Sequence, residues 1–458
     1  MKDSRIFGLI LTLAVIWLSG NLVADDLFLT VYNSNLGVVR EVRNLQFEQG
    51  NNLRFGFTDV ASSIDATSVT FELADSTLDV AVLEQNYAYD LVSPQKIYEK
   101  YIDSNIDIIT EKGDLFSGTL LSFQGGYLVI KAPDGRIKSI SAGQVRDVTF
   151  PELPEGLITR PTLFWRYNSG FAGPADAIVS YQTTGINWNA EYVGVLSEDE
   201  KQLDLTGWVS IDNRSGKTYK DAKLKVVAGD ISRVYDDVSI RRGTLKALAA
   251  MPIAEGAGFE EKAFFEYHLY TLPRRATLAN METKQISMFD PTVARVEKEL
   301  RYSGNPGQRD VKVYLKTKNS EENGLGMPLP AGRVRVFKAD SDKSLILLGE
   351  DRIGHTPRNE EVKLTIGTAF DIVGETVMVA RRSISEKVSE QDFRIEVRNQ
   401  KENEPVTVVV YRSLGGFWEI TNSSVDYVKK SAGEVEWTLD IAPDEKAVID
   451  YTVRYTQP

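Results

Sequence analysis

The stretch Val435-Glu436-Trp437-Thr438-Leu439-Asp440-Ile441 alternates large apolar residues with polar ones at every position. The same period of two recurs at Ile449–Tyr455 and at Val311–Lys316. Successive side chains of a β-strand point to opposite faces of a sheet, so this pattern indicates antiparallel strands with one buried face. Because most of the chain follows this pattern, the sequence predicts a mainly all-β protein.

One short helix and one small barrel interrupt this pattern. Ser93 and Pro94 suit the N-cap and the first position of a helix, and Ile97 and Tyr101 would share one of its faces. Five short strands separated by glycine-bearing turns follow, as far as residue 150. This arrangement is typical of a small closed five-strand barrel similar to the Sm-like barrels. Many such barrels bind RNA, but the acidic, exported character of this chain favours a structural role.

The chain is long enough for several domains. Pro151, Pro154 and Pro161 indicate a linker, and residues 242–262 have no clear period, which suggests a mobile insertion. The predicted segments are a signal peptide (1–24), an N-terminal β-domain (25–92), the short helix with the small barrel (93–150), a central β-sandwich region (151–371) and a C-terminal immunoglobulin-like β-sandwich (372–458).

The N-terminus has the charge, length and order of a secretory signal peptide. Lys2 and Arg5 precede the apolar run Ile6–Leu18, and cleavage is predicted after Ala24. The alternative is an uncleaved membrane anchor, but thirteen apolar residues are fewer than the roughly 20 that a spanning helix needs. The sequence therefore predicts an exported protein, periplasmic or associated with the cell envelope, with no integral membrane span after cleavage.

Composition limits the chemistry and the partners. The chain contains no cysteine, which excludes thiol chemistry and disulfides. Its formal net charge is −12, and loss of the predicted signal peptide changes this to −13, since that segment holds two basic residues and one acidic residue. Such a charge disfavours nucleic acid and anionic lipid as broad-surface partners.

Several motifs of the central region resemble a bacterial family of unknown function. They are Gly185-Ile186-Asn187-Trp188, Gly207-Trp208, Asp212-Asn213-Arg214-Ser215-Gly216, Ala228-Gly229-Asp230, Tyr267-His268-Leu269-Tyr270, Glu282-Thr283-Lys284-Gln285 and Pro328-Leu329-Pro330-Ala331-Gly332. The longer relatives of that family are mucoidy-inhibitor-A-like proteins. The resemblance implies a bacterial envelope protein, but no catalytic residues come with it. The longer relatives carry a coiled coil where this chain has the barrel-like segment, so no role of the coiled coil is transferred.

Three residues are possible ligand contacts: Trp208, Asp212 and Trp418. Trp208 shares a predicted strand face with polar neighbours, whereas Trp188 and Tyr192 share theirs with small and apolar residues, which is typical of a core. The alternative for Trp208 is that a second sheet or the 242–262 insertion covers the ring.

No catalytic, cofactor-binding or metal-binding residues are predicted. His268 and His355 are the only histidines and lie far apart, without the spacing of a zinc site or of a serine nucleophile with its base. A nucleotide-binding glycine loop is also missing from the sequence. The acidic turn at Asp340–Asp342 is more typical of a solvated loop than of a calcium site.

These observations leave three functions open. The leading hypothesis is a non-enzymatic β-scaffold for an unknown protein partner or cell-surface polymer, with open sheet edges as its signature. The alternative is a glycan-binding module, expected to show two or more coplanar exposed rings. The second alternative is a hydrolase of envelope polymers with a carboxylate pair whose pKa values differ.

Overall fold

The computed structural model describes residues 26–89, 94–151, 158–229, 231–232 and 259–457. In these residues the regular structure consists of strands β1 to β30, the α-helix α1 (Pro94–Lys100) and the 3-10 turns η1 (Ala142–Gln144) and η2 (Glu321–Asn323). The predicted mainly all-β fold with one short helix is confirmed. The predicted signal peptide and most of the 242–262 insertion lie outside the described residues.

Contacts between residues divide the chain into two compact units. The first comprises Met1–Phe28 and Val38–Thr183, and the second comprises Leu29–Gly37 and Thr184–Pro458. Strands β1 (Asp26–Tyr32) and β2 (Leu36–Phe47) each contribute residues to both. All three residues predicted as ligand contacts belong to the second unit.

In the first unit, two sheets meet through aromatic side chains. One is the end β2-β12-β4 of a larger sheet with the order β16-β17-β15-β1-β2-β12-β4, and the other has the order β3-β11-β5. Phe71 on β4 lies 5.0 Å from Trp165 on β11, measured between ring centroids, and Phe57 lies 5.4 Å from the same tryptophan. The remaining strands are β3 (Gly50–Thr58), β4 (Ile64–Leu73), β5 (Val80–Ala88), β11 (Thr162–Ser169) and β12 (Gly173–Thr183).

The first unit also buries one ion pair, Glu41 with Arg43, on β2. Tyr181 donates its hydroxyl hydrogen to Glu41 Oε1 at 2.9 Å, and Arg43 Nη1 donates to the Thr58 carbonyl at 2.8 Å. These bonds satisfy groups that would otherwise lose their solvation without compensation.

Residues 94–150 form a small module with its own core. The strand order is β10-β6-β7-β8-β9, and Tyr101, directly after the helix, joins a cluster with Ile108, Leu120 and Leu128. Gly118 allows close approach of two strands, since a Cβ there would lie 2.4 Å from the Lys131 carbonyl oxygen. The strands are β6 (Asn105–Thr110), β7 (Leu115–Gln124), β8 (Tyr127–Lys131), β9 (Ile137–Ser141) and β10 (Val145–Thr149).

The predicted closure of this module into a barrel is not found in the part of the chain that the structure describes. Strands β9 and β10 are the two edges of the sheet and do not pair. The turn η1 joins them, and its backbone bonds go elsewhere: Ala142 N donates to Gly126 O, and Glu111 N donates to Gln144 O. The sheet therefore stays open between two strands of five residues each.

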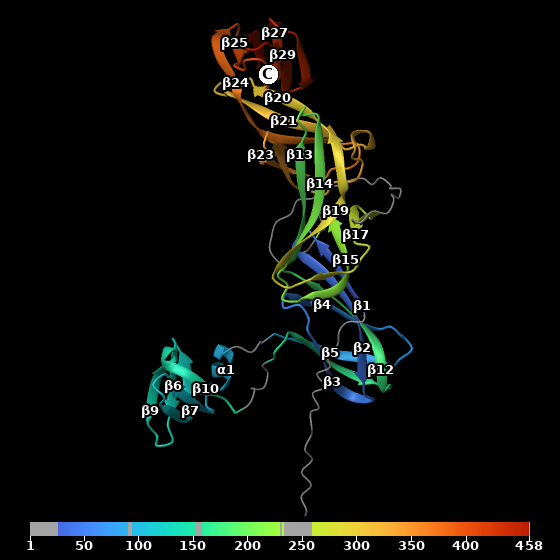
Figure 1. Ribbon diagram of the computed structural model, residues 1–458, viewed down its shortest axis with the longest axis vertical. Helices are drawn as coiled ribbons and strands as arrows, with labels where there is room; N and C mark the ends of the chain where they lie inside the picture. Colours follow the sequence, from blue (N-terminus) through green and yellow to red (C-terminus); the bar gives the residue numbers. More distant parts are fainter. Residues whose placement is uncertain (1–25, 90–93, 152–157, 230, 233–258, 458) are drawn as a thin grey trace, which may run out of the picture. The chain divides into compact units, whose positions relative to one another are not determined.

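The second unit contains a five-stranded sheet with the order β19-β14-β13-β22-β23, in which β13 and β22 run parallel. In Figure 1, β13, β14 and β19 are neighbouring strands. One face is buried and includes Trp188 and Tyr192, as the alternation predicted. The strands are β13 (Ile186–Leu196), β14 (Gln202–Asn213), β19 (Glu282–Arg295), β22 (Gly332–Ala339) and β23 (Leu345–Ile353).

Two further groups of residues pack against this buried face. Trp188 donates its indole N–H to the Val227 carbonyl at 3.0 Å, and its ring contacts that of Tyr270. Tyr192 donates its hydroxyl hydrogen to the Pro330 carbonyl at 2.8 Å, and Tyr270 donates to Pro328 at 3.1 Å. The strands on this side are β15 (Tyr219–Ala228), β16 (Glu260–Phe264), β17 (Tyr267–Thr271) and β18 (Ala276–Leu278).

The last sheet has nine strands in the order β27-β30-β25-β24-β21-β20-β26-β29-β28. One cluster of buried residues, which includes Tyr302, Ile395, Val408 and Trp437, draws on both halves of this order. The strands are β20 (Glu297–Ser303), β21 (Asp310–Lys318), β24 (Glu361–Ser383), β25 (Val388–Asn399), β26 (Val406–Ser413), β27 (Phe417–Ser423), β28 (Tyr427–Ser431), β29 (Glu434–Ile441) and β30 (Lys446–Thr456).

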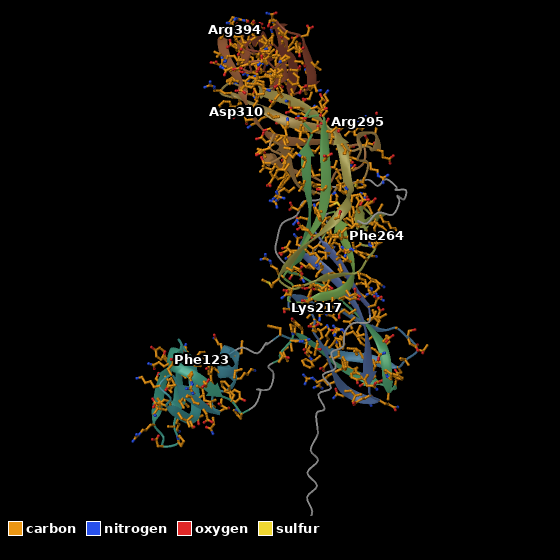
Figure 2. The ribbon with its side chains drawn as sticks, viewed as in Figure 1. Phe123, Lys217, Phe264, Arg295, Asp310 and Arg394 are labelled. Carbon is orange, nitrogen blue, oxygen red and sulfur yellow. The ribbon has the colours of Figure 1, made fainter. Side chains whose placement is uncertain are left out.

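Three buried asparagines, Asn213, Asn319 and Asn399, repeat one local arrangement at or just after the end of a strand. In each, the side-chain amide donates to three backbone carbonyls, and its oxygen accepts a backbone N–H. Asn213 Nδ2, for example, donates to the carbonyl of Lys217, labelled in Figure 2, at 2.9 Å. Each asparagine thus satisfies backbone groups that the strand ends leave unpaired.

Candidate functional site

The candidate site is the solvent-facing side of the five-stranded sheet. We call it the Trp208 face and define it by Asn189, Glu191, Trp208, Ser210, Gln285 and Arg333. Strand register fixes their positions: Glu191 lies between Trp208 and Arg333, and Ser210 lies between Asn189 and Gln285. Residues two apart on a strand share a face, so both rows belong to one surface.

Trp208 differs from the other tryptophans that the structure describes. Its side chain is 37% exposed, and its indole N–H has no hydrogen-bond partner among the described residues. The indole N–H groups of Trp165, Trp188, Trp418 and Trp437 all donate, over distances of 2.8 to 3.1 Å. A second sheet therefore does not bury this ring within the described residues, contrary to one alternative for it. Residues 242–258 of the insertion lie outside the described residues.

Beside Trp208 runs a row of polar side chains from three strands. Asn189 on β13 pairs across the sheet with Ser210 on β14, which pairs with Gln285 on β19. Asn189 and Gln285 are exposed and Ser210 is half-buried, and none of the three side chains bonds to another described residue. Their amide and hydroxyl groups are open to solvent or to a ligand.

Beside Trp208 the charged groups pair with one another, whereas Asp204 on β14 and Arg352 on β23, exposed on the same side, have no ion-pair partner among the described residues. Arg333 donates from Nε and Nη2 to the two carboxylate oxygens of Glu191, at 3.1 and 3.0 Å. Arg335 joins Glu191 to Glu350, with distances of 3.1 and 2.9 Å. Burial by itself raises the pKa of Glu191, but the two guanidinium groups outweigh it and hold that pKa below its usual value.

The other two predicted contact residues are already engaged. Asp212, four residues after Trp208 on β14, accepts a hydrogen bond from Thr283 Oγ1 at 3.0 Å and pairs with Arg214 Nε at 2.9 Å. Trp418 lies on β27, in a different sheet, and Lys429 Nζ lies 4.2 Å from its ring centroid. The structure thus places Trp208 and Asp212 on one sheet face and Trp418 elsewhere.

Sequence reasoning missed Asn189, Gln285 and Arg333 as members of this surface. The first of these had a usable signal, because Asn187 and Asn189 alternate with Trp188 and Ala190 and so must face away from the core. The neighbourhood of Arg333 had no such signal, since it depends on the parallel pairing of β13 with β22.

Both histidines have local partners. His268 Nδ1 lies 2.7 Å from Glu261 Oε1, across the β16–β17 hairpin. His355 Nδ1 accepts the backbone N–H of Ala331 at 3.1 Å. Within the described residues, no three or more histidine or acidic side chains are grouped as a metal site would need.

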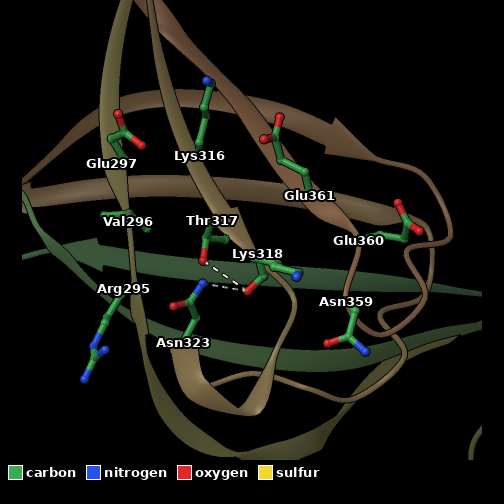
Figure 3. Close-up of a pocket in the computed structure, with 10 residues that line it drawn as sticks. All are labelled: Arg295, Val296, Glu297, Lys316, Thr317, Lys318, Asn323, Asn359, Glu360 and Glu361. Carbon is green, nitrogen blue, oxygen red and sulfur yellow. Dashed lines mark hydrogen bonds between the residues drawn. The ribbon is translucent and has the colours of Figure 1, made fainter.

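Figure 3 shows a cavity of about 650 Å³ beside β20 and β21. Basic and acidic side chains both line this cavity: Arg295, Lys316 and Lys318, and Glu297, Glu360 and Glu361. Val296 is the one aliphatic residue among those that line it. Small-molecule sites are usually lined mostly by apolar side chains, so this cavity has the character of a hydrated surface hollow.

Glu390 and Asp392, two carboxylates that share a cation, do not show the pKa contrast that a hydrolase pair needs. Glu390 and Asp392 both bind Arg382. Arg454 and then Arg382 lower the pKa of Glu390, and Arg382 lowers that of Asp392. A hydrolase pair needs one carboxyl group with a raised pKa to act as the acid and one with a low pKa to act as the base or nucleophile, and two lowered pKa values do not provide this.

The nine-stranded sheet also has an open edge, on β24. This strand pairs with β21 as far as Val373, and with β25 from Ile372 to Ser383. From Glu375 onward, therefore, no described strand pairs with the other side of β24. We call Glu375–Ser383 the β24 edge. It exposes Val377, Met378 and Val379 to 50%, 46% and 62%.

Comparison of this sequence with models of known protein families gives no match, and comparison with curated proteins gives none either. Among the described residues, no helix has the length and apolar character needed to span a bilayer.

Proposed function

We propose that this chain is an exported, non-enzymatic β-scaffold of the bacterial cell envelope that recruits a protein partner by adding a strand to the β24 edge. The observation that carries the proposal is the run of three consecutive exposed apolar residues, Val377 to Val379, on a strand segment with a free side. An unpaired edge is a template for another strand, and proteins often protect such edges with charges, prolines or bulges. The β24 edge has a bulge between Met378 and Ala380 and two arginines after it, so the part that remains open to strand addition is the apolar run itself.

Export and family membership are part of the same proposal. Export is supported by Lys2, Arg5 and the apolar run that follows, with cleavage after Ala24. Kinship with the mucoidy-inhibitor-A-like family is supported by the motif Pro328–Gly332, whose backbone carbonyls accept bonds from the buried Tyr192 and Tyr270.

The finer fold assignments are proposals too. An immunoglobulin-like arrangement for the C-terminal sandwich is supported by the core shared between β25 and β30 on one side and β26 and β29 on the other. An open, Sm-like arrangement for residues 94–150 is supported by the helix that precedes the strands and by η1 between β9 and β10.

The test is site-specific cross-linking in the native envelope. A photoreactive residue replaces Met378, and the same chain is prepared with Val377→Lys and Val379→Lys. We expect a discrete cross-linked protein with the apolar edge and its loss with the lysines, because charges on an edge oppose strand addition. The control is Tyr127→Lys, exposed at 54% but on β8, which is paired at that residue with β7 on one side and with β9 on the other. A cross-link that survives the two edge lysines, or none at all, would rule out this partner mode.

A further inference from the structure

We propose that the Trp208 face binds an uncharged oligosaccharide. The observation behind this is one juxtaposition: an exposed indole with a free N–H beside a row of three polar side chains, Asn189, Ser210 and Gln285, that make no bonds within the described residues. Elsewhere in the described structure, tryptophan N–H groups are paired.

The indole suits one face of a sugar ring. A pyranose presents a flat patch of C–H groups surrounded by hydroxyls, and an indole presents a flat apolar surface with one donor at its rim. Trp208 offers both, since its ring makes no stacking or cation–π contact with the described residues. The face supplies this one exposed ring, not the two or more coplanar rings expected of a glycan-binding module, so the polar row has to provide the rest of the recognition. Trp418, by contrast, has Lys429 against its ring and its N–H bonded to Ala432.

The polar row suits the hydroxyls of the same ligand. A sugar hydroxyl both donates and accepts, and so do the side-chain amides of Asn189 and Gln285 and the hydroxyl of Ser210. These residues lie on three adjacent strands, so the row extends over about 10 Å. That length fits more than one sugar unit and places hydroxyl partners along one side of the indole.

The balance of charge selects an uncharged ligand. Glu191 and Glu350 are each held by Arg333 and Arg335, and Asp212 is held by Arg214. Next to the indole and the polar row, an anionic or cationic ligand would have to displace one of these partners to gain a counter-ion. The unpaired charges lie farther off: Arg352 is three strands from Trp208, and Asp204 is four residues before it on β14. A neutral ligand uses the free amides and leaves the ion pairs intact.

This site is independent of the proposed strand addition. The Trp208 face belongs to the five-stranded sheet, and the β24 edge belongs to the nine-stranded sheet. Loss of one activity therefore leaves the other in place, and the two proposals fail separately.

Isothermal titration calorimetry on the full chain tests the site. The probes are neutral tetrasaccharides of glucose, of mannose, of galactose and of N-acetylglucosamine, with tetragalacturonate as the charged comparison. We expect at least one neutral probe to bind, and Trp208→Ala to raise its Kd about tenfold, equivalent to about 1.4 kcal/mol. Asn189→Ala combined with Gln285→Ala should weaken binding further than either single change.

Two controls keep the outcome decisive. Trp418→Ala removes the other half-exposed tryptophan and should leave the Kd unchanged, and thermal unfolding of Trp208→Ala establishes that it folds. Retention of most affinity in Trp208→Tyr would support stacking as the mode of binding. The proposal is overturned if no neutral probe binds at millimolar concentration, if only tetragalacturonate binds, or if Trp208→Ala binds as the native chain does.

Discussion

The two faces of the five-stranded sheet use the same residue types for opposite purposes. Trp188 and Trp208 lie on the directly paired strands β13 and β14, yet Trp188 is buried with its N–H bonded, whereas Trp208 faces outward with its N–H free. The face of the sheet to which a side chain points is set by its position in the strand, because successive side chains point to opposite faces. This position, rather than the residue type, decides which tryptophan supports the fold and which is available to a ligand.

The largest expected effect concerns the buried tryptophan. Trp188→Ala should destabilise the second unit by about 3–5 kcal/mol, because it leaves a cavity against Tyr270 and strips the Val227 carbonyl of its donor. Urea unfolding followed by circular dichroism measures this. An effect below about 1 kcal/mol would mean that the buried face tolerates loss of its largest side chain, and the contrast between the faces would fail.

The same comparison between a buried and an exposed side chain can be made with two asparagines, Asn399 and Asn189. Asn399→Asp should cost about 2–3 kcal/mol, because an aspartate oxygen replaces the amide that donates to Glu404, Ile441 and Ala442. The cost should grow as pH rises through about 3.9, since carbonyl oxygens disfavour the ionised form and raise the folded-state pKa of the new carboxyl group. Stability measured against pH should show this slope for Asn399→Asp and not for Asn189→Asp on the exposed face.

A smaller effect on stability is expected when the pH is lowered, and it depends on Glu191. The pKa of Glu191 is below its usual value in the folded protein, so the unfolded chain binds the proton more tightly. The stability from this group is present above the unfolded pKa, near 4.5, and is lost as pH falls through the lower folded value. Glu191→Gln should therefore flatten part of the decline in unfolding free energy below pH 4.5. An unchanged acid profile would show that the Arg333 and Arg335 bonds do not persist in solution.

The smallest effect on stability belongs to the exposed tryptophan. Trp208→Ala should change the free energy of unfolding by no more than about 1 kcal/mol, because only cross-strand contacts of a partly exposed ring are lost and its N–H has no acceptor among the described residues. The measurement is the same urea titration, with Trp188→Ala as the reference. A loss comparable to that of Trp188→Ala would show that the ring supports the fold instead of a ligand.

Local alternation carried most of the fold prediction. The pattern at 435–441 and 449–455 gave strands whose buried residues, such as Trp437 and Tyr451, the structure confirms. The polar surroundings of Trp208 followed from the same alternation. The alternation of buried and exposed positions can be recognised within a single strand, so these predictions needed no information about which strands pair.

Pairing between strands that are distant in the chain could not be predicted from the sequence. The 23-residue strand β24 pairs with β21 through its first half and with β25 through its second, and this exchange creates the open edge. The roles of Asn213, Asn319 and Asn399 were equally hidden, because a single asparagine near a turn looks the same whether it is solvated or bonded to three carbonyls. Such features depend on which segments of the chain come together. The alternation of apolar and polar residues does not specify this.

The parallel pairing of β13 with β22 has a consequence for the time course of folding. Arg333, which holds Glu191 across this pair, follows it by 142 residues in the chain. Strands β13 and β14 are joined by a short turn and can form a hairpin early, but the other side of β13 has to wait until β22 has been synthesised. A newly made chain therefore keeps that strand edge exposed for about half of the synthesis of the second unit, a period in which unpaired strands are prone to associate with the wrong neighbour.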